Sequence, residues 1–146
     1  MEIKMYDMVL LKDNREGTIV EIYDNGKAFE VDILIDNTGE YPEYETETVK
    51  AEDIKLKFNN KDDILKYRKI HQYSFENEKK LEGQECVCLY CKSKFNYNKI
   101  KLWIEDKKEK TAQCPYCEID CVVPISIENE YKLTDKDIEN LNKIYF

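Results

Sequence analysis

Two cysteine tetrads are the residues of this sequence best suited to chemistry. They read Cys88-Leu-Tyr-Cys91 and Cys114-Pro-Tyr-Cys117, with 22 residues between them. A Cys-x-x-Cys turn directs two sulfurs at one point, and two such turns complete the tetrahedral thiolate shell of a structural zinc site. The spacing therefore predicts one structural Zn²⁺ ion with four ligands, Cys88, Cys91, Cys114 and Cys117.

Three other uses of the tetrads stand as alternatives. Redox-active dithiols share the pattern, but no thioredoxin-like βαβ sequence surrounds these. An iron–sulfur cluster also takes four cysteines, so the ligands alone do not separate zinc from iron. A catalytic zinc normally keeps one coordination position for water, whereas four thiolates close the shell. The ion expected here is therefore structural.

The other cysteines and the single histidine are secondary candidates. Cys86 is the alternative to Cys88 as a ligand, although it would break the two-residue spacing that both tetrads share. Cys121 adjoins Val122 and is expected to be a small buried thiol. His71 is expected to be structural, with a metal ligand or a catalytic base as the alternative.

The N-terminus indicates the compartment. It carries acidic residues where a signal peptide needs basic ones, and its longest apolar run is Met8 to Leu11. No stretch approaches the 18 or more apolar residues typical of a membrane span. We therefore predict a cytoplasmic protein without membrane contact, in which paired cysteines bind metal more often than they form disulfides.

Charge is distributed unevenly along the chain. Residues 1–58 hold 7 Lys and Arg against 15 Asp and Glu, whereas residues 59–146 hold 16 of each. Such an acidic first half disfavours a phosphate backbone as its partner, because nucleic-acid affinity rests largely on cationic contacts. The charge is suited to a basic protein partner, and its simplest alternative role is to maintain solubility.

Strand patterns fill the first half. Residues 5–11, 17–23, 28–35, 41–50 and 54–58 are rich in β-branched and aromatic residues, with turn residues between them. Asn25-Gly26 fits a tight hairpin turn, and Phe29, Val31, Ile33 and Ile35 alternate with mostly polar neighbours. We predict a small, partly open SH3-like β-barrel over residues 1–58.

The second half mixes helices with short strands. Asn60 and Ser74 are candidate caps for two helices in a helical bridge, residues 59–83. Residues 84–146 form the expected zinc-ribbon module, with a short helix from Asn98 to Asp106 and strands at 111–113 and 122–127. Thr134 and Asp137 resemble a capping box that starts a closing helix. The predicted fold class is α+β.

Both halves resemble small bacterial families. Gly17-Thr-Ile-Val-Glu-Ile-Tyr23 and Ala28-Phe-Glu-Val-Asp-Ile33 resemble domains of unknown function that repeat G-T-V-V-E-V-Y and A-Y-E-V-E-F. That resemblance covers roughly residues 5–58 and implies the barrel but no activity. His71-Gln-Tyr-Ser74, Cys86-Val-Cys-Leu-Tyr-Cys91 and Thr111-Ala-Gln-Cys-Pro-Tyr-Cys117 resemble short uncharacterised zinc-ribbon proteins of the cytoplasm. This second resemblance implies that His71 and Cys86 belong to the family pattern.

The expected function is binding without catalysis. The sequence has no Gly-rich phosphate loop, nucleophile elbow or His-Glu-x-x-His motif. We expect an acidic surface that includes Glu43, Glu45 and Glu47 to meet a basic protein, as an immunity protein does with a bacterial toxin. The first alternative is a nucleic-acid-binding zinc ribbon that uses the lysines between the tetrads. The second is a hydrolase with its site near His71.

Overall fold

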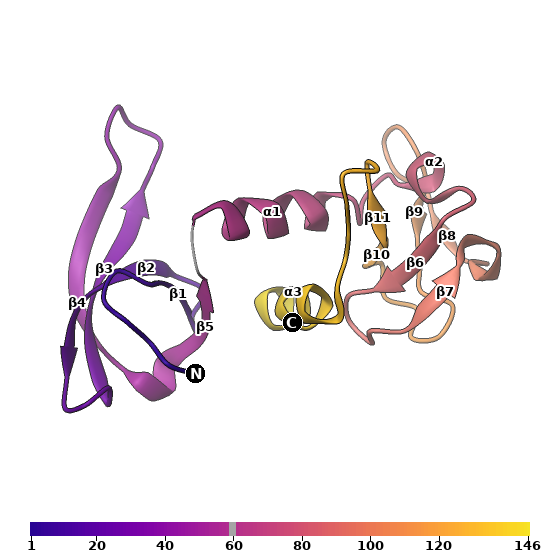
Figure 1. The fold of residues 1–146 in the computed structure, drawn as a ribbon. Coiled ribbons are helices and arrows are strands. Elements are labelled where there is room, and N and C mark those ends of the chain that lie inside the picture. Colours follow the sequence, from indigo (N-terminus) through magenta and orange to yellow (C-terminus); the bar gives the residue numbers. More distant parts are fainter. Residues whose placement is uncertain (59–60) are drawn as a thin grey trace. The chain divides into compact units, whose positions relative to one another are not determined.

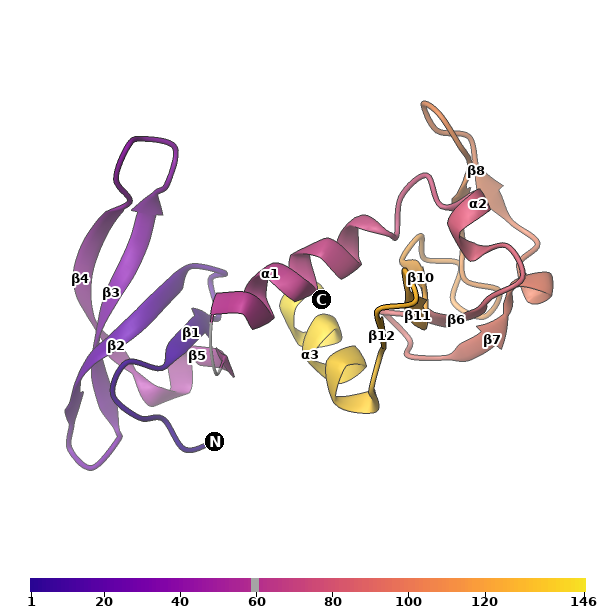
Figure 2. The same cartoon turned by 45° about the horizontal axis from the view of Figure 1, so that its top comes forward.

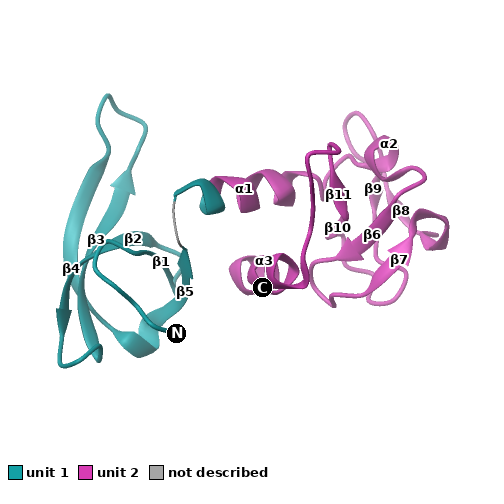
Figure 3. Cartoon of the chain, viewed as in Figure 1, with its two compact units in different colours: residues 1–64 teal, residues 65–146 magenta. Residues whose placement is uncertain are grey.

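The computed structural model describes residues 1–58 and 61–146 of the chain. The chain divides into two compact units, Met1–Ile64 and Leu65–Phe146 (Figure 3). The segment 59–83, expected as a helical bridge, therefore belongs to the second unit from Leu65 onward. Its expected cap Asn60 lies outside the described residues. The fold is α+β, with antiparallel pairing in each described sheet and few helices.

The first unit is a five-stranded antiparallel sheet with the strand order β4-β3-β2-β1-β5 (Figures 1 and 2). It contains β1 (Met8–Leu11), β2 (Glu16–Tyr23), β3 (Ala28–Asp36), β4 (Glu43–Lys50), the 3-10 turn η1 (Ala51–Asp53) and β5 (Ile54–Phe58). Each segment expected as a strand overlaps one of the five strands, although β2 begins one residue earlier and β3 ends one residue later than expected. The sheet does not close into a barrel, and β4 and β5 are its two edges.

Alternation along β3 places one face of this strand in the core. Phe29, Val31 and Ile33 are buried, as their spacing predicts. The prediction was wrong for Ile35, which is 58% exposed. Pairing between β2 and β3 ends at Ile33, so the hairpin of β3 and β4 extends beyond the other strands at Ile35 (Figure 1). The core cluster consists of Val9, Leu11, Ile19, Phe29, Val31, Ile33, Val49 and Ile54.

Close packing and a tight turn fix the pairing of β2 with β3. A Cβ atom added at Gly17 would lie 2.3 Å from Cγ1 of Val31, so this position in the sheet requires glycine. At the turn, φ is positive at Asp24, Asn25 and Gly26. The Gly26 N–H donates to the carbonyl of the last β2 residue at 3.0 Å, so Asp24 and Asn25 are the central residues of the turn. The turn begins one residue earlier than predicted.

Short elements make up the second unit. They are α1 (Lys61–Gln72, which starts in the first unit), α2 (Glu78–Leu81), β6 (Glu85–Cys88), β7 (Lys94–Asn96), the 3-10 turn η2 (Tyr97–Lys99), β8 (Trp103–Ile104), β9 (Thr111–Ala112), β10 (Val122–Pro124), β11 (Ser126–Ile127), β12 (Tyr131–Lys132) and α3 (Asp135–Tyr145). The strands form the sheets β10-β6-β7, β8-β9 and β11-β12. The capping box of α3 is confirmed, because the Thr134 hydroxyl accepts from the Asp137 N–H and the Asp137 carboxylate accepts from the Thr134 N–H.

Two helix starts were predicted wrongly. The Ser74 hydroxyl donates to the His71 carbonyl and caps no helix; α2 begins after Asn77. The Asn77 side chain is buried, donates to the Val122 carbonyl and accepts from the Ala112 N–H, so it joins α2 to β10 and β9. No helix runs from Asn98 to residue 106, where the chain forms η2 and then pairs β8 with β9.

Candidate metal centre

The two cysteine tetrads meet at one point of the second unit. All four sulfur atoms of Cys88, Cys91, Cys114 and Cys117 lie within 4.8 Å of one another. The Cys88 and Cys117 sulfurs are 3.6 Å apart, and the Cys91 and Cys114 sulfurs are 3.7 Å apart. A zinc–sulfur bond of about 2.3 Å gives a tetrahedron with edges of about 3.8 Å, so these separations fit a metal tetrathiolate. All six cysteines of the chain are free thiols.

The two tetrads have the same backbone conformation, which we call the first knuckle (residues 88–93) and the second knuckle (114–119). The Lys92 N–H donates to the Cys88 carbonyl at 2.8 Å, and the Glu118 N–H donates to the Cys114 carbonyl at 3.0 Å. Lys92 and Glu118 both have positive φ angles, 64° and 65°. Cys88 and Cys114 in turn donate their N–H groups to residues 93 and 119. Each turn therefore closes on itself and directs two sulfurs toward the other.

Strands and a small core hold the knuckles. Cys88 ends β6 and lies opposite Val122 of β10, while Cys114 follows β9 by two residues. The knuckle cysteines pack with buried apolar residues, with Trp103 partly buried beside them. These apolar residues are Leu81, Phe95, Ile100, Ala112 and Val122. The site is therefore built into a hydrophobic core cluster of this unit.

Helix α3 contacts the first knuckle through one side chain. The Asn142 side-chain amide donates to the carbonyls of Leu89 and Tyr90 at 3.0 and 2.8 Å. The Tyr90 ring also meets the Phe146 ring edge to face, with centroids 5.1 Å apart. The first knuckle thus supplies one polar anchor of the C-terminal helix.

Burial acts to raise the pKa values of three thiols in the sulfur cluster. It raises the pKa of Cys88 and of Cys114. Burial also acts to raise the pKa of Cys91, but hydrogen bonding with the side chain and backbone of Ser93 outweighs it and brings the pKa to about 7. Because a metal binds the thiolate form, metal binding at neutral pH must release protons from the thiols with raised pKa.

The secondary candidates lie outside the sulfur cluster. Cys86 lies opposite Pro124 and is fully buried, and burial raises its pKa to about 12. Burial likewise raises the pKa of Cys121 to about 12. The His71 ring stacks on Tyr145 with centroids 3.7 Å apart and meets Phe75 edge-on. Burial lowers the pKa of His71.

The three glutamates predicted to bind a partner lie along β4, and all three are exposed. Glu45 lies opposite Ile33 and Glu47 opposite Val31, so their side chains share the sheet face that forms the core further along. Glu47 is already bound, because Arg15 donates to both of its carboxylate oxygens. Among the described residues, the side chains of Glu43 and Glu45 have no hydrogen bond or ion pair.

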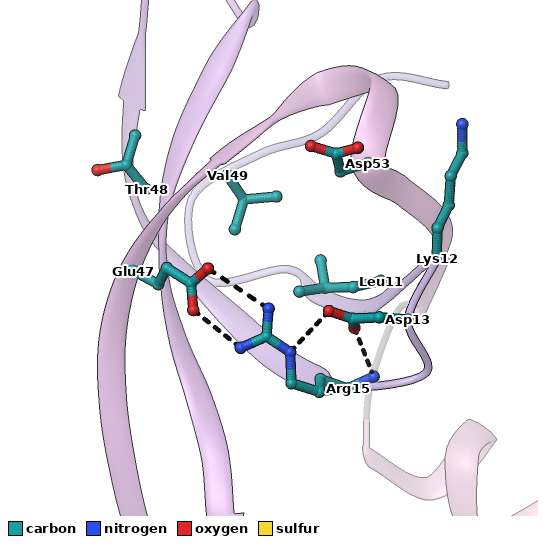
Figure 4. A pocket seen from close by; sticks show the side chains of 8 residues that line it. All are labelled: Leu11, Lys12, Asp13, Arg15, Glu47, Thr48, Val49 and Asp53. Atoms are coloured by element: carbon teal, nitrogen blue, oxygen red, sulfur yellow. Dashed lines mark hydrogen bonds and ion pairs between the residues drawn. The ribbon is translucent and has the colours of Figure 1, made fainter.

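A polar pocket surrounds the Arg15–Glu47 pair (Figure 4). The Arg15 guanidinium also donates to Asp13 at 2.8 Å, and the pocket extends to Val49 and Asp53. The hydrogen bonds from Arg15 hold the pKa of Glu47 below its usual value. Sequence reasoning missed this pocket, since its residues come from segments more than 30 positions apart and carry no shared motif.

Comparisons with family models, with curated proteins and with solved structures gave no match to this chain. In the part of the chain that the structure describes, no helix is long and apolar enough to cross a membrane.

Proposed function

We propose that the second unit is a zinc-ribbon-like module built around one structural zinc ion. The four clustered sulfurs, with separations close to the edges of a zinc tetrathiolate, carry this proposal. Four thiolates leave no coordination position for a reacting water, which supports a structural ion and a protein that does not use it in catalysis. Zinc is favoured over iron because a closed thiolate shell that only stabilises a fold needs no redox activity.

Metal removal tests this proposal. A structural zinc contributes about 10–16 kcal/mol of apparent binding free energy, whereas a unit of this length has about 4–12 kcal/mol of folding free energy. A strong chelator should therefore unfold Leu65–Phe146, and Trp103, the single tryptophan, should report it by fluorescence. Elemental analysis should give one zinc per chain; iron in its place would contradict the choice of metal, and no metal at all would contradict the site.

Three cysteine-to-serine variants test which cysteines bind the metal. Cys88→Ser should abolish zinc retention, whereas Cys86→Ser and Cys121→Ser should retain it, because both thiols lie outside the sulfur cluster. Zinc loss in Cys86→Ser combined with retention in Cys88→Ser would reverse the assignment.

The first unit is, in our proposal, an SH3-like module that binds a basic protein through the acidic side of β4. Two observations support it: residues 1–58 carry the whole net charge of −8, and Glu43 and Glu45 are exposed carboxylates without partners among the described residues. Complementary charge accelerates association and selects the partner. An immunity protein that neutralises a basic bacterial toxin is one protein of this kind.

A binding titration separates this function from nucleic-acid binding. A labelled basic peptide should bind at low salt and weaken as salt rises, because the Debye length falls to about 8 Å at physiological ionic strength. Glu43→Lys with Glu45→Lys should abolish this binding, whereas Glu2→Lys with Glu52→Lys makes the same charge change elsewhere and should weaken it less. Saturable binding of labelled oligonucleotides that disappears when Lys99 and Lys101 are replaced would instead favour the nucleic-acid alternative.

A further inference from the structure

The two edges of the sheet in the first unit differ in how they are protected. β5 is short and carries Lys55 and Lys57, the kind of residue that blocks further pairing at an edge. β4 has eight residues, of which only Val49 is buried, and within the described chain its only strand partner is β3. β4 is therefore the long, accessible edge of this sheet (Figures 1 and 2).

The register shows which backbone groups of β4 face outward. The Ala51 N–H donates to the Lys27 carbonyl, and the direction of the backbone groups alternates along an antiparallel ladder. Glu45, Glu47 and Val49 therefore direct their N–H and C=O groups toward β3. The residues that alternate with them, Tyr44, Thr46 and Thr48, direct their N–H and C=O groups away from the sheet. An added strand would find donors and acceptors at these three positions.

The side chains of β4 give the edge two distinct faces. The side chains of Glu43, Glu45 and Glu47 lie on one face, and Glu47 forms an ion pair with Arg15. The opposite face carries Tyr44, which is 56% exposed, followed by two threonines. A strand beside β4 would therefore place every second side chain next to a carboxylate and the intervening ones next to an aromatic or β-branched surface.

We propose that β4 binds an extended basic segment of the partner protein as a sixth, antiparallel strand. This inference rests on the proposed binding function and specifies its mode. The segment alternates Lys or Arg with apolar residues, so that two cations lie opposite Glu43 and Glu45. Backbone hydrogen bonds supply affinity and the alternation supplies specificity, as in other cases of strand addition. A second copy of this chain is disfavoured, because its β4 would bring like charges together.

Three peptides and one pair of variants test the strand mode on the full-length zinc-loaded protein. The peptides are Lys-Val-Lys-Val-Lys-Val, the permuted Lys-Lys-Lys-Val-Val-Val, and the first peptide with alternate backbone N-methyl groups. Thr46→Pro removes one outward N–H, a change that an edge strand tolerates. Thr46→Val is its control, because it also loses the hydroxyl bond to Asp32 but keeps the N–H.

The alternating peptide should bind about tenfold more tightly than the other two, and Thr46→Pro should weaken it about tenfold while Thr46→Val does not. Equal, salt-sensitive binding of all three peptides would overturn strand addition and leave the acidic docking function intact. Binding of none would overturn both. A dimer of the free protein, shown by its sedimentation and dissociated by Thr46→Pro, would assign the edge to a second copy and also overturn the proposal. Circular dichroism of Thr46→Pro checks its fold, and the N-methylated peptide tests the same contacts without changing the protein.

Discussion

Replacing Lys92 or Glu118 by glycine is expected to stabilise the second unit. Both residues have φ near 65°, a conformation that costs a residue with a Cβ atom about 1–2 kcal/mol. Both side chains are exposed, so truncation should sacrifice little packing. Glycine avoids this cost but loses about 0.5–1 kcal/mol more backbone entropy on folding than alanine does. The net expected gain is about 0.5–1 kcal/mol for each variant.

This gain should appear in two measurements. Because the knuckle conformation is needed to bind the metal, zinc affinity in a chelator competition should rise about two- to fivefold. The thermal midpoint of the zinc-loaded protein, followed by Trp103 fluorescence, should rise by about 2–8 °C, since 1 kcal/mol shifts a unit of this size by about 4–8 °C.

Two matched controls isolate the backbone effect. Lys92→Ala removes the long side chain but keeps the Cβ atom, so it should change neither measurement. Lys101→Gly introduces glycine at another exposed position that lacks a positive φ, so it should destabilise the unit. If Lys92→Gly and Glu118→Gly behave like Lys92→Ala, the knuckle backbone is unstrained and the reasoning is refuted.

Three further outcomes are expected. Gly17→Ala should destabilise the first unit by about 1–3 kcal/mol in urea unfolding because its methyl group would overlap Val31. Gly39→Ala should be nearly neutral, because its methyl group would make only an ordinary contact of 3.7 Å with the Tyr41 carbonyl oxygen; equal effects would contradict the close approach at Gly17. Asn142→Ala should cost about 1–3 kcal/mol because two hydrogen bonds to carbonyls of the first knuckle are lost, each worth about 0.5–1.5 kcal/mol, and an unchanged thermal midpoint would show that α3 is anchored otherwise. Burial opposes ionisation of Asp137, but its hydrogen bonds hold the pKa below the usual value, so its contribution to stability is complete above about pH 3.9 and is lost as the pH falls through the folded value. The difference in stability between wild type and Asp137→Asn should therefore shrink in acid, and a constant difference would contradict this linkage.

Local sequence patterns predicted the features that depend on neighbouring residues. The paired spacing of the tetrads indicated which sulfurs meet, and the four residues from Thr134 to Asp137 contain the whole capping box. The burial predicted from the alternation along β3 was wrong only at Ile35, where the neighbouring strand β2 ends. Burial of that position depends on the length of another strand, which the β3 sequence does not contain.

The errors share a physical cause in tertiary contacts. Asn98 has the side chain of a helix cap, yet the following residues pair with Thr111 and Ala112, and this pairing outweighs a weak helix propensity. The Arg15–Glu47 pair joins positions 32 residues apart. Asn142 contacts carbonyl groups about 50 residues earlier, and a carbonyl has no signature in a sequence. Such contacts become visible only when the chain is folded.

The matching shapes of the two knuckles also make the module a bivalent chelator. Its two halves are joined by a tether, residues 94–113. The tether sets the effective concentration of one half around the other, and its entropy changes slowly with length. Doubling the tether costs only about 0.6 kcal/mol. Lys107 and Lys108 are exposed in the connection between β8 and β9, so inserted residues there should leave zinc binding nearly unchanged. The chain can therefore acquire length at this point far more easily than beside any of its four sulfur ligands.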